Sequence, residues 1–380
     1  MTSSFESSPR ISQKELARVL GLSQSTVSLG LRNHPDIGPA TCARIREAAR
    51  RLGYVPDPCL SALSAYRKRV KPVRYQGTLA WLSNDAIGEG RGEGRGWPAL
   101  PACHGSAAER AGQLGYRLED FCLREPGMSA RRMEEIFCSR GIPGILVSPS
   151  GGNGSVEGFC FGRFSAVTFD HSLESPRLHC VSYHRLGMME RVFRRLHELG
   201  YRRPGLAVYP ESDRRAGRAW SAGFRNEQHR YADVVHVPPL LAESGSRELF
   251  FAWFRQWEPD VILTPEASRL DWLEEAGVAV PGDTGFCLLS VPPPGKEHCA
   301  GCQEDPARVG AGAVELLVDM IGRHEVGIPA SQVCVLTEGV WRQGSTLGKR
   351  IRPAAVAAAA ATAATPSLST GGDRWRRESM

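Results

Sequence analysis

Strand-like and helix-like segments alternate along most of this chain, from about residue 75 onward. Short apolar runs such as GTLAWLS (77–83), GILVSP (144–149) and DVILTP (260–265) are separated by longer amphipathic runs such as MMERVFRRLHELGY (188–201). This alternation is typical of a parallel β-sheet whose faces are covered by helices. It continues for about 270 residues, which is more than one hydrophobic core usually holds. The sequence therefore predicts an α/β body with two lobes.

The first 57 residues have a different pattern, which predicts three short helices. The segment SQKE (12–15) has the Ser and Glu spacing of a capping box, and Gly21 is suited to end the helix that follows. Ser23 can cap a second helix that runs to about Leu31. Pro39 suits the first turn of a third helix. A tight turn between the first two helices indicates a helix-turn-helix unit.

The positive charge of the chain is concentrated near its start. Residues 1–75 contain 13 Lys and Arg and five Asp and Glu, a net charge of +8, although the whole chain carries only +6. A basic head on a nearly neutral body favours a polyanionic partner such as DNA. The alternative explanation is a solvated basic surface, because charge runs are often only that.

Several function classes have no support in the composition. The eleven cysteines are scattered and odd in number, which favours reduced thiols over a disulfide framework. Cys299 and Cys302 form a Cys-x-x-Cys motif, but no second pair completes a zinc site. No apolar run approaches the roughly 20 residues of a membrane span, and the N-terminus does not resemble a secretory signal. No nucleophile and base are suitably arranged. We therefore expect a cytoplasmic protein without a catalytic site, metal or cofactor.

Residues 14–58, KELARVLGLSQSTVSLGLRNHPDIGPATCARIREAARRLGYVPDP, are similar to the DNA-binding head of the lactose-repressor/galactose-repressor (LacI/GalR) family of bacterial regulators. The family pattern appears here as Ala17, Gly21-Leu22-Ser23, Thr26-Val27-Ser28, Leu52-Gly53-Tyr54 and Pro56. More loosely, the segments ELGYRRPGLAVYP, AVPGDTGFCLLS and GVWRQGST resemble the periplasmic-binding-protein-like effector domain of the family. The resemblance covers about residues 11–348.

The resemblance implies a domain order. Residues 11–57 would form a helix-turn-helix DNA-binding domain, and residues 58–74 a hinge helix and linker. Residues 75–348 would form the two-lobed domain for effector binding and dimerisation. The Ala-rich residues 349–380 are of low complexity and predict a disordered tail.

The resemblance also assigns roles in DNA binding, residue by residue. Gln24 and Ser25 fall on the main base-reading positions, and Leu29 falls on a third that is frequently arginine. Leu29 removes a bidentate guanine contact but can touch a thymine methyl, which predicts an unusual operator. Leu63 matches a hinge leucine that enters the minor groove, although it can also pack between two hinges. The remaining expected contacts to phosphates or base edges are Ser12, Ser23, Thr26, Ser28 and Arg32.

For the effector, the resemblance indicates a site between the lobes. Arg214 matches a ligand-contacting arginine of some members, although a solvated loop charge is the alternative. Trp97 and Trp220 lie near pocket positions and can stack on a sugar, or belong to the core. Glu266 and Ser290 stand where the family often has aspartate, which weakens the case for a sugar. The sequence therefore leaves the effector unnamed, and leaves open that none exists.

The sequence therefore predicts a sequence-specific transcriptional regulator, and the resemblance to the family implies that it is a repressor. The resemblance implies a homodimer on a pseudo-palindromic operator of double-stranded DNA, controlled by a small-molecule effector. Two alternatives stay open. One is a DNA-binding regulator whose degenerate pocket takes no effector, and the other is a solute-binding α/β protein with an incidental basic head.

Overall fold

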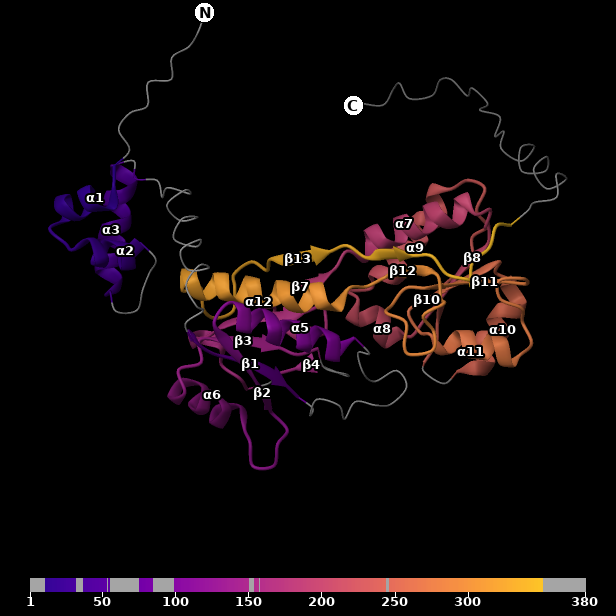
Figure 1. Cartoon of the computed structure of the whole chain (residues 1–380), viewed down its shortest axis with the longest axis horizontal. Helices are drawn as coiled ribbons and strands as arrows, with labels where there is room; N and C mark the ends of the chain where they lie inside the picture. The colour runs from indigo at the N-terminus through magenta and orange to yellow at the C-terminus, as the bar shows by residue number, and fades with distance from the viewer. Residues whose placement is uncertain are drawn as a thin grey trace, which may run out of the picture.

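The computed structural model describes residues 11–31, 37–52, 54, 75–84, 99–149, 154–156, 158–243 and 246–350. These residues form a three-helix head and an α/β body with two lobes (Figure 1). Both parts of the predicted fold class are therefore confirmed. The predicted hinge (58–74) and almost all of the predicted tail (349–380) lie outside the described residues.

The head contains the predicted helices, which are α1 (Gln13–Leu20), α2 (Gln24–Leu31) and α3 (Pro39–Arg51). Helix α1 begins with a complete capping box, in which the Ser12 Oγ accepts a hydrogen bond from the Glu15 N–H and the Glu15 carboxylate accepts one from the Ser12 N–H. The helix ends at Gly21, whose φ of 66° lies in the left-handed region that favours glycine. The turn from α1 to α2 follows directly.

The core of the head is small, and its apolar residues come from all three helices. Leu16, Val27 and Ile45 are fully buried at its centre. Gly30 of α2 packs against the Ile45 side chain so closely that a Cβ at this position would collide with it. Tyr54, after α3, accepts a hydrogen bond from the Gln13 Nε2 over 2.9 Å, and this contact ties the end of the head to its first helix.

The first lobe is built on a six-stranded sheet in the order β13-β7-β5-β3-β1-β2, in which every pair is parallel. Alternate residues of each strand point to opposite faces. Leu79 and Trp81 of β1 therefore pack with α5 and α12 on one face, whereas Ala80 and Leu82 pack with α6 on the other. The elements of this lobe are β1 (Gly77–Ser83), α5 (Leu100–Gln113), β2 (Tyr116–Cys122), α6 (Ala130–Ser139), β3 (Gly144–Val147), β4 (Gly154–Ser155), η1 (Phe161–Arg163), β5 (Ser165–Phe169), β6 (Leu173–Ser175), β7 (His179–Tyr183), α12 (Pro306–Arg323) and β13 (Cys334–Thr337).

The second lobe repeats this plan around a parallel sheet in the order β11-β10-β8-β9. Helices α7 and α9 cover one face, and α10 and α11 cover the other. The elements of this lobe are α7 (Arg185–Glu198), β8 (Pro204–Val208), α8 (Pro210–Arg215), α9 (Ala219–Arg230), β9 (Leu240–Leu241), α10 (Arg247–Trp257), β10 (Val261–Thr264), α11 (Ser268–Glu275), β11 (Gly285–Leu288), β12 (Gly301–Gln303) and β14 (Val340–Arg342).

The chain passes between the lobes at three places within the described residues. It leaves the first sheet after β7, returns between β12 and α12, and leaves again between β13 and β14. These connections bring residues that are distant in the sequence to the junction of the lobes. No helix among the described residues has the length and apolar character needed to cross a membrane.

Candidate functional site

The second helix of the head presents short polar side chains at its exposed start. The Ser23 Oγ accepts a hydrogen bond from the Thr26 N–H over 3.0 Å and so caps α2. It also lies 2.8 Å from the Ser25 Oγ and 2.7 Å from the Thr26 Oγ1. Backbone N–H groups and hydroxyls at a helix N-terminus are suited to bind a phosphate.

The structure places the predicted DNA contacts on different parts of the head surface. Gln24 and Ser25 are exposed, whereas Thr26, Ser28 and Leu29 are half-buried. Ser12 is also exposed, and its hydroxyl belongs to the capping box of α1. The two remaining predicted contacts, Arg32 and Leu63, lie outside the described residues. The base-reading role of these side chains remains a prediction.

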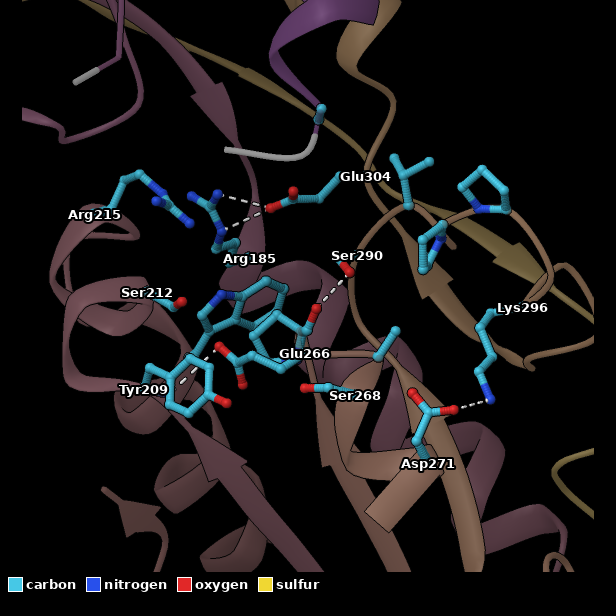
Figure 2. Close-up of a pocket in the computed structure, with 17 residues that line it drawn as sticks. Arg185, Tyr209, Ser212, Arg215, Glu266, Ser268, Asp271, Ser290, Lys296 and Glu304 are labelled. Carbon is cyan, nitrogen blue, oxygen red and sulfur yellow. Dashed lines mark hydrogen bonds and ion pairs between the residues drawn. The ribbon is translucent and has the colours of Figure 1, made fainter. Parts of the chain in front are cut away.

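A pocket of about 620 Å³ lies at the junction of the two lobes (Figure 2). Its volume is in the range of small-molecule sites. Aromatic and proline side chains form much of its apolar wall, and six charged side chains and three serines supply its polar groups. The lining residues are Ala99, Arg185, Tyr209, Ser212, Arg215, Trp220, Pro265, Glu266, Ala267, Ser268, Asp271, Ser290, Val291, Pro293, Pro294, Lys296 and Glu304.

Arg185, which lines this pocket, connects segments from both lobes. Its side chain is only 4% exposed. Its guanidinium donates to both carboxylate oxygens of Asp170, over 2.5 and 2.6 Å, and its Nε donates to Glu304 over 3.0 Å. The guanidinium also lies over the rings of Tyr183 and Trp220. Because these contacts use most of its donors, Arg185 acts mainly as a structural anchor between the lobes.

The two carboxylates beside Arg185 differ in how readily they ionise. Burial raises the pKa of Glu304, and the nearby Asp170 charge adds to this rise although Arg185 opposes it. Burial also opposes the ionisation of Asp170, but the charge and hydrogen bonds of Arg185 outweigh it and lower its pKa. Arg185 therefore favours the ionised form of Asp170, whereas burial favours the protonated form of Glu304.

Arg214 and Arg215 are adjacent in α8 but differ in their contacts. The Arg214 guanidinium pairs with Glu211, its side chain is 41% exposed, and it is not among the residues that line the pocket. Arg215 lines the pocket and makes no side-chain hydrogen bond or ion pair within the described part of the chain. Successive residues of a helix point about 100° apart, so a pattern match that selects one of two neighbours easily selects the wrong direction. In our proposal, Arg215 therefore replaces Arg214 as the pocket arginine.

Glu266 lies on the pocket wall, at the end of β10. Its carboxylate accepts hydrogen bonds from the Thr264 hydroxyl over 2.9 Å and from the Tyr209 N–H over 3.4 Å. Burial raises its pKa, and the charge of the nearby Arg269 opposes the rise. Arg269 is fully buried over the rings of Tyr209, Phe250 and Trp272, and no described residue accepts a hydrogen bond from its guanidinium. The aromatic faces therefore supply most of its contacts.

The other effector positions expected from the sequence are found as follows. Trp220 is buried and lines the pocket, and Ser290 lines it while its hydroxyl donates to the Pro265 carbonyl over 2.6 Å. Trp97 lies outside the described residues. Lys296 lines the side of the pocket opposite Arg215 and pairs with Asp271 over 2.6 Å (Figure 2). Three pocket residues, Arg185, Glu304 and Lys296, were not predicted from the sequence, because no motif marks a residue that reaches the pocket only through long-range folding.

Comparisons with known proteins identify the head. Residues 12–57 match the family model described as "Bacterial regulatory proteins, lacI family". The chain is 43% identical over 54 residues to the HTH-type transcriptional regulator AglR of Rhizobium meliloti (strain 1021). This matched segment is 14% of this chain and 15% of that protein. It is 40% identical over 74 residues to the sucrose operon repressor of Shigella flexneri, 20% of each chain. The similarity in sequence to these relatives thus spans a fifth of their length or less.

Solved structures extend the similarity in fold to the body. A transcriptional regulator CelR–cellobiose complex has a TM-score of 0.54 at 16% identity, and the match covers 89% of this chain and 100% of that one. The lac repressor dimer bound to operator and the anti-inducer ONPF has a TM-score of 0.53 at 14% identity, covering 90% and 100%. The head of this chain therefore matches the lacI family model over residues 12–57, and the fold of the whole chain is similar to the folds of these two regulators.

Proposed function

We propose that this protein is a sequence-specific DNA-binding transcriptional regulator, and a repressor, that acts in the cytoplasm as a homodimer on a pseudo-palindromic operator. The observation that carries the proposal is the exposed start of α2, where Gln24 and Ser25 project from a head that matches the lacI family model. Short polar side chains on an exposed helix fit the major groove and its base edges. The proposal includes no catalytic role and no cofactor.

Selection of operator sequences from random duplex DNA tests this function. The full chain should enrich a palindromic motif at near-physiological salt, and its affinity should fall as salt rises, because phosphate contacts release counterions. An enriched motif without two-fold symmetry would contradict the dimer. Absence of any enriched motif would contradict sequence-specific binding and favour a solute-binding protein with an incidental basic head.

The hinge is part of the same proposal, although its residues are not described by the structure. Leu63 is proposed to enter the minor groove at the centre of the operator. The substitution Leu63→Ala should then weaken binding to the selected operator and leave binding to a scrambled duplex nearly unchanged. An equal loss on both duplexes would contradict the wedge and favour a packing role for Leu63.

The pocket between the lobes is proposed to bind a small-molecule effector that changes operator affinity. Arg215 supplies a guanidinium that makes no side-chain hydrogen bond or ion pair with another described residue, Trp220 supplies an aromatic face, and Glu266 and Ser290 supply further polar atoms. The names of the relatives and neighbours mention sucrose and cellobiose. These two sugars are therefore the first probes, although the proposal does not depend on either.

Arg215→Gln and Arg214→Gln form a matched pair of variants for this site. With any compound that raises the melting temperature of the protein, Arg215→Gln should abolish the shift and Arg214→Gln should retain it. Equal effects of the two variants would contradict the pocket assignment. The effector must also change operator affinity, because binding without such a change would remove its regulatory role.

One observation favours the alternative of a regulator without an effector. Arg185 and Lys296, two of the three cations that line the pocket, are already paired within the protein. A pocket whose charges satisfy one another is less dependent on a ligand. A broad screen of metabolites with no shift in melting temperature, together with normal operator selection, would support this alternative.

A further inference from the structure

Two cysteines face each other across neighbouring strands of the first lobe. Cys180 of β7 and Cys334 of β13 are register partners in a parallel ladder. The Cys180 thiol donates a hydrogen bond to the Cys334 sulfur, and the two Sγ atoms are 2.9 Å apart. Neighbouring strands lie about 4.8 Å apart, within the Cα separations of about 4.4–6.8 Å that disulfides span. No other pair of cysteine sulfurs is hydrogen-bonded in the part of the chain that the structure describes.

The backbone around the pair holds both residues in place. The Cys180 N–H donates to the Val333 carbonyl over 3.0 Å, and the Val333 N–H donates to the His179 Nδ1 over 2.8 Å. The Gln332 side chain donates to the Leu178 carbonyl over 2.6 Å. These hydrogen bonds lie next to the first residue pair of the β7–β13 ladder, which is Cys180 and Cys334, and they fix the register of the two strands there. The sulfurs are therefore brought together by two ordered strands and not by a chance loop contact.

The two thiols differ in access to solvent. Cys334 is exposed on the edge strand of the sheet, whereas Cys180 is buried on the neighbouring strand. The hydrogen bond from Cys180 lowers the pKa of Cys334, and the same bond, together with burial, raises the pKa of Cys180. Redox-sensitive cysteines are typically accessible, have thiolate character and lie beside a second cysteine that resolves the oxidised form.

We propose that Cys180 and Cys334 form a reversible redox site that closes to a disulfide on reaction with a peroxide. With hydrogen peroxide, the Cys334 thiolate attacks one oxygen, so that an S–O bond forms and the O–O bond breaks; the released hydroxide takes a proton from solvent and leaves as water. The Cys180 sulfur then attacks the sulfur of the resulting Cys334 sulfenic acid, so that the S–S bond forms and the S–O bond breaks; the departing hydroxyl takes the Cys180 proton and leaves as a second water. The two thiols lose two electrons in total, which the peroxide gains, and an external dithiol reverses the step.

The location of this site gives it a structural consequence. Strand β7 runs into α7, and strand β13 runs towards β14, so both strands lead into connections between the lobes. The ladder reaches the junction where the His184 N–H donates to the Thr337 carbonyl over 2.8 Å. A disulfide would link the edge strand β13 to its neighbour β7 just before each strand leads into a connection to the second lobe.

The test uses the full chain, treated with hydrogen peroxide and then alkylated with N-ethylmaleimide under denaturing conditions. Peptide mapping without reduction should find the Cys180 and Cys334 peptides linked and two hydrogens lighter than the free pair, and dithiothreitol should release them. Hydrogen exchange at residues 334–337 should be slower in the oxidised protein. Recovery of both cysteines fully alkylated after peroxide would overturn the proposal, as would Cys334 linked only to another molecule.

Variants separate the two steps. Cys334→Ser should lose the linked peptide, whereas Cys138→Ser should retain it, because Cys138 is an exposed cysteine on α6 that is remote from the pair. In Cys180→Ser, the sulfenic acid of Cys334 has no resolving thiol, and dimedone should label it. Absence of dimedone labelling would contradict the attacking role of Cys334. None of these measurements depends on DNA or effector binding.

Discussion

In the head, the described polar side chains proposed to contact DNA lie on helix α2 and its capping residue Ser23, apart from Ser12 at the start of α1, whereas the pocket draws its lining from segments between residues 99 and 304. The head keeps Gln24 and Ser25 exposed to solvent, and the pocket keeps Arg185 and Glu304 buried. Side chains in a local, exposed site can be substituted with little effect on folding. Substitutions in a buried site made from many segments change the stability of the fold as well.

The substitution with the largest expected effect on this difference is Arg185→Met. It should destabilise the body by about 3–5 kcal/mol, because it leaves the buried Asp170 and Glu304 without their cation. Urea unfolding followed by tryptophan fluorescence measures the loss. Arg131→Met is the control, since Arg131 is an exposed residue of α6 and its loss should change stability by less than about 0.5 kcal/mol. Similar values for the two variants would remove the anchoring role of Arg185.

In the head, Gln24→Ala should affect binding and not folding. We expect the affinity for the selected operator to fall by about 1–3 kcal/mol, because the proposed bidentate amide contact to a base edge would be lost. The melting temperature should not change, since Gln24 is exposed. Fluorescence anisotropy with the operator and with a scrambled duplex measures the effect, and Gln113→Ala in α5 serves as the matched control. A parallel loss on the scrambled duplex would assign Gln24 to the DNA backbone instead of the bases.

A smaller effect is expected at the start of α1, where the head depends on a local hydrogen bond. Ser12→Ala removes the side-chain oxygen that accepts from the Glu15 N–H and should cost about 1 kcal/mol of local stability. Ser12→Asp keeps a capping oxygen and should recover most of it. Hydrogen exchange of the α1 amides in the full chain reports the difference. If alanine and aspartate behave alike, the cap does not determine the stability of this helix.

The smallest expected effect concerns the pH dependence of the pocket. Burial raises the pKa of Glu266, so the folded state holds this proton more strongly than the unfolded state. This carboxyl therefore costs stability as pH rises above the ordinary glutamate pKa and through the raised one. Glu266→Gln should match the natural protein near pH 4 and be more stable near pH 7. Urea unfolding at both pH values measures this, with Glu248→Gln as an exposed control on α10. An advantage of Glu266→Gln that shrinks as pH rises would reverse the assignment.

The head could be predicted closely because its signals are local. The Ser12 to Glu15 spacing, Gly21 and Pro39 mark helix ends through contacts within one turn, and the structure contains each of these features. In the body, the strands with strong apolar runs were also predicted. Strand β13 and helix α10 were not part of the predicted alternation. The four residues of β13 are mostly exposed at the sheet edge and carry little burial signal, and the run RELFFAWFRQW of α10 combines aromatic residues with no clear boundary.

The sequence by itself therefore determined the two-part architecture, the helix-turn-helix head and its helix ends, because each depends on spacings of a few residues. Only the tertiary structure decided that Arg215 and not Arg214 lines the pocket, that Arg185 joins Asp170 to Glu304, and that Cys180 meets Cys334. These pairings join residues separated by up to 154 positions. The direction of a side chain and its distant partner follow from how the strands and connections are ordered in space, which no local pattern encodes.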